Sequence, residues 1–149
     1  MKLYQIEIKT VNEVEVFYQS QAKDKVNAST SAYDMIKGLF KKDMQRKEMF
    51  VAVYMNKANM VANIEVLSSG GTSSTVVDVK LIAQGAILSN ASAVIIAHNH
   101  PSGNLSPSRS DIVLTEKTKA ALELFDIQLL DHLILSNNGY ASLADEGDM

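Results

Sequence analysis

The chain contains no cysteine among its 149 residues. This absence excludes disulfide bonds, thiolate metal ligands and cysteine nucleophiles together. Histidine, aspartate and glutamate are then the side chains that remain to hold a first-row metal ion. We therefore expect any side-chain chemistry of this protein to use nitrogen and oxygen atoms.

Long hydrophobic runs are also missing. No apolar stretch approaches the roughly 20 residues that a helix needs to span a bilayer. Residues 1–7 lack the apolar centre of a signal peptide. We therefore expect a cytoplasmic protein with no membrane partner.

Positive charge is not in excess, because the formal net charge is −3. Affinity for nucleic acid comes largely from neutralising phosphates, so a nucleic-acid partner is not favoured. Basic residues gather near residues 37–47, where they are typical of a solvated helix end favoured by the helix dipole. A contact with nucleic acid or an acidic partner is the alternative interpretation. The basic residues of this segment are Lys37, Lys41, Lys42, Arg46 and Lys47.

The chain does contain enough apolar material for a core, since 46% of its residues are hydrophobic. Its length, and the lack of repeats or linkers, predict a single domain over residues 1–149. Within it we expect strands and a helix over 1–47, a core that carries the functional site over 48–143, and an acidic tail over 144–149. The sequence leaves open whether the protein forms a homo-oligomer.

Apolar runs and two-residue alternation predict the strands. Short polar segments between successive runs indicate hairpins in the first half of the chain. The continuous apolar run at 93–97 is typical of a buried strand. The predicted strands span residues 3–9, 13–18, 48–56, 60–66, 93–97, 127–135 and 140–143.

Apolar spacing and capping residues predict three helices. Because strands and helices alternate along the chain, we expect an α+β or three-layer α/β arrangement around one sheet. The predicted helices are one from a Ser29 or Thr30 cap to Phe40, one over 79–88 after an Asp78 cap, and one over 108–125 after Pro107.

Two histidines follow the predicted buried strand at 93–97, in the sequence His98-Asn99-His100. Residues two apart on a strand point to the same face, so His98 and His100 can aim their imidazoles at one point. Asn99 then points away, which is typical of a side chain that fixes a loop by hydrogen bonds. The pattern predicts a metal site where the strand ends.

A third ligand is available at the start of the long helix. The loop 101–107 can fold that helix back over the strand end, which would bring Asp111 to the two histidines. Zinc prefers four ligands, so three protein ligands leave one position for the water of a hydrolytic site. Ser108 precedes Asp111 by three residues and shares its helix face. As an alternative, Ser108 is only a helix cap and Asp111 is only an acidic residue in the first turn. The presence of two histidines, the serine and the aspartate together favours the metal site, with one zinc ion per chain.

Amide hydrolysis also needs a base that moves a proton from water to the leaving nitrogen. The candidates are Glu48, Glu65, Glu116 and Asp131, and the pattern alone does not choose among them. Glu116 is turned away from the face of Asp111, and Glu65 has the spacing of an outward-facing strand residue. Glu48 begins a hydrophobic strand, where it either stands beside the metal or is simply an exposed acid.

His132, next to Asp131 on a predicted strand, is the remaining histidine. It either orients a metal ligand or substrate or is a hydrogen-bonded structural residue. We do not assign it as a ligand.

The motif residues together resemble the RadC-like branch of the JAB/MPN (JAMM) metalloprotease-type domains, over residues 48–142. The family pattern is a glutamate on an early strand, then H-x-H, seven residues, Ser, two residues and Asp. The resemblance implies a cytidine-deaminase-like α-β-α sandwich with a mixed sheet. It further implies zinc ligands His98, His100 and Asp111, a general acid/base Glu48 and an oxyanion-stabilising Ser108.

Two departures from the family limit what the resemblance implies. Asn99 stands where the eukaryotic deubiquitinating members carry Ser or Thr, so we do not expect ubiquitin cleavage. Larger RadC proteins place a helix-hairpin-helix DNA-binding region before this domain, and the segment before Glu48 lacks the glycine-hairpin pattern of one.

The sequence therefore predicts a zinc-dependent hydrolase that cleaves peptide or isopeptide amides, with a peptide or protein as its substrate. The competing hypothesis is a scaffold module without efficient turnover that acts with DNA-repair or other DNA-processing partners. The complete set of five motif positions favours the enzyme, because a scaffold has no need of all of them.

Overall fold

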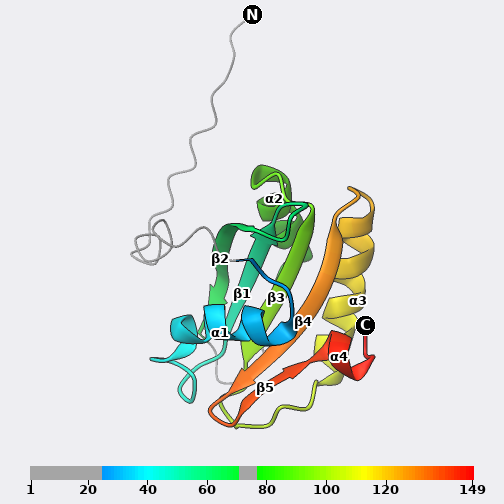
Figure 1. Ribbon diagram of the computed structural model, residues 1–149. Helices are drawn as coiled ribbons and strands as arrows, with labels where there is room; N and C mark the ends of the chain where they lie inside the picture. The colour runs from blue at the N-terminus through cyan, green and yellow to red at the C-terminus, as the bar shows by residue number, and fades with distance from the viewer. Residues whose placement is uncertain (1–24, 71–76) are drawn as a thin grey trace, which may run out of the picture.

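The computed structural model describes residues 25–70 and 77–149 of the chain. The strands predicted at 3–9 and 13–18 lie outside the described residues. Within these residues the elements follow one another as helix, hairpin, helix, strand, helix and a final pair of strands with a short helix (Figure 1). Their bounds are α1 Ser29–Phe40, β1 Met49–Met55, β2 Val61–Ser69, α2 Val79–Leu88, β3 Ala93–Asn99, α3 Arg109–Glu123, β4 Gln128–Ser136, β5 Gly139–Ser142 and α4 Leu143–Glu146.

The strands form one mixed sheet in the order β2-β1-β3-β4-β5. β1 pairs antiparallel with both β2 and β3, β3 pairs parallel with β4, and β4 pairs antiparallel with β5. Every residue of β1 and β3 is buried, as expected for continuous apolar strands covered on both faces. The predicted mixed sheet is confirmed.

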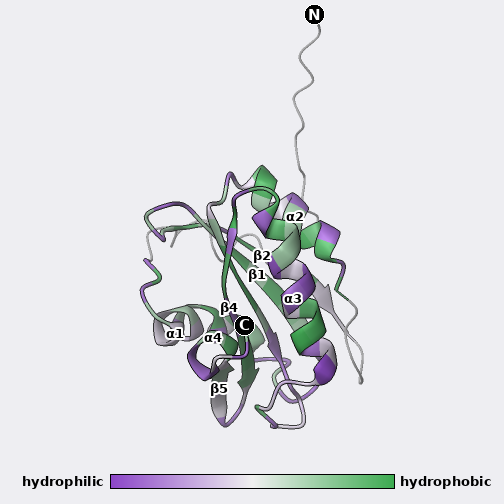
Figure 2. Ribbon diagram, turned by 90° about the vertical axis from the view of Figure 1, so that its right-hand side faces the viewer, coloured by the Kyte–Doolittle hydropathy of each residue, from purple (hydrophilic) through white to green (hydrophobic). Residues whose placement is uncertain are grey.

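Helices cover both faces of the sheet, with α1 on one face and α2 and α3 on the other (Figure 2). Alternate residues of β1 divide between the two resulting cores. Val51 and Val53 pack with Ile36 of α1, whereas Ala52 packs with Ile82 of α2. The three-layer sandwich predicted from the sequence is thereby confirmed.

The first helix is capped differently from the prediction. Its N-cap is Ala28, and Ser31 supplies the capping oxygen by accepting hydrogen bonds from the backbone N–H groups of Asn27 and Ala28. The prediction of a Ser29 or Thr30 cap is therefore wrong. Ser29 instead donates a hydrogen bond to Asp145, which ties α1 to the end of the chain.

The other two predicted helix starts are confirmed. Asp78 caps α2 and accepts a hydrogen bond from the Lys80 N–H, and Ser108 caps α3. β5 ends at Ser142, one residue before the predicted end of the last strand. The one-turn helix α4 follows from Leu143 into the predicted acidic tail, and the Ser142 side chain caps it by accepting from the Asp145 N–H. No helix within residues 25–70 and 77–149 has the length and apolar character needed to cross a bilayer.

Candidate metal centre

The two motif histidines meet at the end of β3. His98 pairs in register with Phe50 of β1 and Ile134 of β4, which places it in the centre of the sheet, and it is 1% exposed. His100 follows β3 directly and is half-buried. Its Nε2 atom lies 2.9 Å from Nε2 of His98. The prediction that the two imidazoles are aimed at one point is confirmed.

Asn99 points to the opposite face of β3, as predicted. Its Oδ1 accepts from the Met49 N–H at 2.8 Å, and its Nδ2 donates to the carbonyls of Met44 at 2.9 Å and Lys47 at 3.0 Å. The bonds to Lys47 and Met49 flank Glu48 on both sides. Through these bonds the fully buried Asn99 links β3 to the segment that carries Glu48.

Asp111 reaches the histidines from the first turn of α3. Its Oδ1 is 3.3 Å from His98 Nε2, and its Oδ2 is 3.6 Å from His100 Nε2. A capping box holds the carboxylate, because the Ser108 N–H donates to Asp111 Oδ2 at 2.7 Å while the Asp111 N–H donates to Ser108 Oγ at 3.2 Å. The helix-cap interpretation of Ser108 is thus correct, and the same cap aims Asp111 at the histidines.

Glu48 lies at the same place. Ligand atoms of Glu48, His98 and His100 all fall within 4.8 Å of one another, which is close enough for the three residues to hold a metal ion. We call Glu48, His98, His100 and Asp111 the histidine–carboxylate cluster.

The other three carboxylates proposed as bases lie elsewhere. Glu65 accepts a hydrogen bond from the Tyr54 hydroxyl at 3.0 Å. Asp131 is buried and accepts from the Ser142 hydroxyl and the Ala144 N–H. Glu116 is exposed on α3. Of the four candidates, Glu48 is the one within the cluster.

The protonation states of the cluster suit a cation. Burial lowers the pKa of His98 to about 4, so its ring is neutral near pH 7. Burial alone would raise the pKa of Asp111, but hydrogen bonds with His100 and Ser108 outweigh it and hold this pKa well below its usual value. The hydrogen bond with Asp111 raises the pKa of His100. An ionised carboxylate thus faces two imidazole nitrogens.

The donors of the cluster fit zinc. Imidazole nitrogen and carboxylate oxygen are both ordinary zinc ligands, and three of them around an open position are typical of catalytic zinc sites. The His100 Nδ1 lies 2.8 Å from the Asn104 carbonyl, which leaves its Nε2 for the metal. His98 has its Nδ1 against His132, at 2.8 Å.

A cavity of about 840 Å³ opens beside the cluster. We call it the site groove. Ser108 and Glu48, the two predicted catalytic residues, both line it. Residues 77–79 at the start of α2 and the first half of α3 form its walls. Its volume is in the range of ordinary ligand pockets, and its walls combine apolar and charged side chains. The lining residues are Glu48, Val77, Asp78, Val79, His100, Ser108, Ser110, Asp111, Val113, Leu114 and Lys117.

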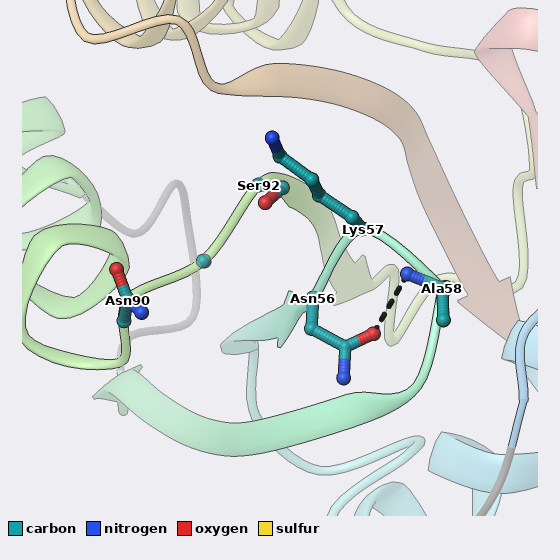
Figure 3. A pocket seen from close by; sticks show the side chains of 6 residues that line it. Asn56, Lys57, Ala58, Asn90 and Ser92 are labelled. Atoms are coloured by element: carbon teal, nitrogen blue, oxygen red, sulfur yellow. Dashed lines mark hydrogen bonds between the residues drawn. The ribbon is translucent and has the colours of Figure 1, made fainter.

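A second cavity, of about 440 Å³, lies at the other end of the sheet (Figure 3). Turn residues line it, and none of them is His, Asp or Glu. The Asn56 side chain accepts from the Ala58 and Met60 N–H groups and is therefore used in the turn itself. The groups suited to metal chemistry are at the site groove.

Sequence reasoning did not single out Thr115. The available signal was its spacing, because four residues after Asp111 it shares the same helix face. Thr115 is buried and its hydroxyl contacts His132, the histidine whose role the sequence left open.

Fold and site together define a three-layer α/β sandwich with a candidate metal centre at the end of its central strands. The family model of the RadC-like JAB domain matches residues 26–148. The chain belongs to this family, as its motif residues indicated.

The chain is similar to several proteins that carry the name UPF0758 protein. The protein of Methanosarcina mazei is 34% identical over 130 residues, 87% of this chain and 56% of the relative. That of Porphyromonas gingivalis is 42% identical over 126 residues, 84% of this chain and 55% of the relative. That of Aquifex aeolicus is 35% identical over 131 residues, 88% of this chain and 55% of the relative. The chain thus spans about half the length of these relatives.

Proposed function

We propose that this chain is a zinc-dependent hydrolase of peptide or isopeptide amide bonds. His98, His100 and Asp111 hold one zinc ion in this proposal. The observation that supports it most is the convergence of two imidazole nitrogens and the Asp111 carboxylate at the edge of the site groove, with Glu48 beside them. Family membership supports the same conclusion.

A bound zinc ion supplies an electrophilic centre that makes water acidic near pH 7 and polarises a carbonyl group. The Glu48 carboxylate accepts a proton from the attacking water and donates it to the leaving amine nitrogen. The Ser108 hydroxyl, which lines the site groove, donates a hydrogen bond to the oxygen on which negative charge develops. The site groove holds the substrate chain on either side of the bond that breaks.

Two ligand sets compete, because Glu48 could take the place of Asp111 as the third ligand. We favour Asp111, since each of its oxygens lies against one histidine Nε2 and its low pKa keeps it ionised. The capping box also fixes this carboxylate before any metal binds. Glu48 is then left for proton transfer.

The substitutions Asp111→Asn and Glu48→Gln distinguish these roles. We expect Asp111→Asn to lose stoichiometric zinc, because a neutral amide replaces the anionic ligand. Glu48→Gln should keep its zinc but lose at least roughly a hundredfold in turnover of a peptide or isopeptide library, because proton transfer is lost. Metal analysis and turnover assays check both.

The outcomes are distinct. Zinc loss in Glu48→Gln and not in Asp111→Asn would exchange the two roles. Undiminished turnover in Glu48→Gln would remove Glu48 from the reaction, and an absence of zinc from the unsubstituted protein would overturn the proposal.

The scaffold alternative has less support. It relies on the basic segment at 37–47 as a contact for DNA-processing partners. Part of that charge is already paired, since Lys37 contacts Asp34 while Arg46 and Lys47 contact Asp43. These pairs favour the solvated helix end as the explanation of the segment.

A further inference from the structure

His132 is a buried titratable group that the proposed reaction does not use. It lies on β4 opposite Ile96, is 0% exposed and does not line the site groove. Its two ring nitrogens contact a threonine hydroxyl and another imidazole, and no carboxylate of the described residues contacts either of them, so this buried ring is neutral. A neutral imidazole has one N–H donor and one acceptor nitrogen, and its neighbours decide which is which.

The hydrogen bonds around His132 can be assigned a direction from Thr115. The Thr115 hydroxyl donates to the Asp111 carbonyl at 2.7 Å, because a carbonyl only accepts. With its single proton used, Thr115 Oγ1 is the acceptor for His132 Nδ1, which is 2.7 Å away. The proton of His132 is therefore on Nδ1, and its Nε2 is an acceptor.

The same reasoning continues to His98. His132 Nε2 lies 2.8 Å from His98 Nδ1, so His98 donates from Nδ1. Since neutral His98 has only one ring proton, its Nε2 carries a lone pair. That lone pair faces His100 and Asp111. The direction of every bond follows from one threonine hydroxyl on α3 and from the neutral state of the two buried rings.

We propose that Thr115 and His132 form a buried hydrogen-bond relay that holds His98 in the tautomer with Nε2 free to bind metal. Both are positioning residues, since neither lines the site groove nor contacts the Nε2 atoms of His98 and His100. The inference builds on the proposed zinc site. It adds to that site His132 on β4, which contacts the proposed ligand His98, and Thr115 on α3, which contacts His132.

The relay has two consequences for the cluster. It contains no charged group, so Asp111 remains the source of negative charge among the three proposed ligands. It also begins at the Asp111 backbone carbonyl and ends at the His98 ring. Two proposed ligands from different elements are thereby tied together, which fixes their spacing before metal binds.

The tautomers of the metal-free protein provide a direct test that needs no substitution. Long-range proton–nitrogen NMR of the histidine rings in the full chain distinguishes Nδ1–H from Nε2–H. We expect Nδ1–H in both His98 and His132. A dominant Nε2–H form of either residue would overturn the relay.

Substitution of Thr115 gives a second readout. Thr115→Val removes the hydroxyl at nearly constant shape, and we expect zinc affinity, measured by competition with a coloured chelator, to fall roughly ten- to a hundredfold. The His98 ring should lose its single tautomer in the metal-free variant. Thr115→Ser keeps the hydroxyl and should restore both properties.

Thr118 provides the matched control. It lies one turn further along α3, is 0% exposed, and its hydroxyl makes no hydrogen bond to any described residue. Thr118→Val should leave zinc affinity and the His98 tautomer unchanged. Equal loss in both valine variants, or none in Thr115→Val, would contradict the relay. A protein with the expected tautomers that binds no zinc would refute the proposed function alone.

Discussion

At the scale of single residues, the buried side chain of Asn99 forms hydrogen bonds with several backbone groups at once. Asn99 separates the two histidines in sequence, yet its side chain serves the opposite face of β3. Its side chain makes four hydrogen bonds, to backbone groups of Asp43, Met44, Lys47 and Met49, all in the segment that carries Glu48. One buried amide therefore links the strand of the histidines to the position of the proposed base.

The substitution Asn99→Ala tests this link. It leaves one backbone donor and three carbonyls without this partner, so we expect the free energy of unfolding to fall by about 2–4 kcal/mol. Turnover should drop roughly ten- to a hundredfold as Glu48 loses its place, while zinc content stays at the unsubstituted level. Urea unfolding, turnover assays and metal analysis measure the three effects.

Asn138→Ala is the control, because Asn138 also donates to a backbone carbonyl, that of Gly103, but is exposed. We expect a change below about 0.5 kcal/mol there. Zinc loss in Asn99→Ala, or stability equal to that of the control variant, would refute the positioning role of Asn99.

At the scale of elements, α2 packs against β1 and β2 through a glycine. A Cβ atom at Gly85 would lie against the Tyr54 hydroxyl and 2.7 Å from Glu65 Oε2. Tyr54 is fully buried and donates to Glu65, and burial beside Glu65 raises its pKa, so its hydroxyl stays protonated and in place. The close approach of α2 to β1 and β2 depends on this position.

Alanine substitutions at two helical glycines separate packing from helix propensity. Gly85→Ala should gain about 1 kcal/mol from propensity but lose about 1–3 kcal/mol to overpacking, with a net loss of stability. Gly38→Ala in α1 meets nothing within 4 Å and should gain about 0.5–1 kcal/mol. Urea unfolding of both variants measures the difference. Stabilisation by Gly85→Ala would show that α2 packs less closely than described.

At the scale of the whole molecule, the periodicity of strands and helices predicts contacts between residues that are close in the sequence. The pairing of His98 with His100 follows from strand alternation, and the link between Ser108 and Asp111 follows from helix spacing. Contacts across the sheet required the strand register. The place of Glu48 depends on Phe50 pairing with His98, and that of His132 on a shift between Val94 and Ile95 in the β3–β4 pairing.

The strand register cannot be obtained from the sequence, which explains why the sequence alone assigns neither the base nor the role of His132. The pattern does not choose the base among four carboxylates, because the spacing of residues along the chain does not give the distances between strands. His132 could not be assigned because Thr115, its partner, comes from a helix packed across the sheet. The α1 cap was mispredicted because neighbouring hydroxyls compete, and Ser29 is used by the chain end instead.

The buried histidines make the whole fold sensitive to acid. Below about pH 6.5 the unfolded chain takes up protons at His98 and His132. In the folded protein, burial lowers the pKa of His98 to about 4 and that of His132 well below its usual value. The unfolded state therefore binds more protons, so the free energy of unfolding falls with pH, by up to about 1.4 kcal/mol per pH unit for each histidine.

Two groups oppose this loss, since Asp111 raises the pKa of His100 and burial raises that of Asp131. We expect the histidines with lowered pKa values to prevail, so that metal-free protein becomes less stable from about pH 6.5 towards pH 4. Urea unfolding of chelator-treated protein across this range measures the slope. His100→Gln removes one opposing group and should steepen it. A free energy of unfolding that stays constant or rises on acidification would mean that His98 and His132 accept protons in the folded state.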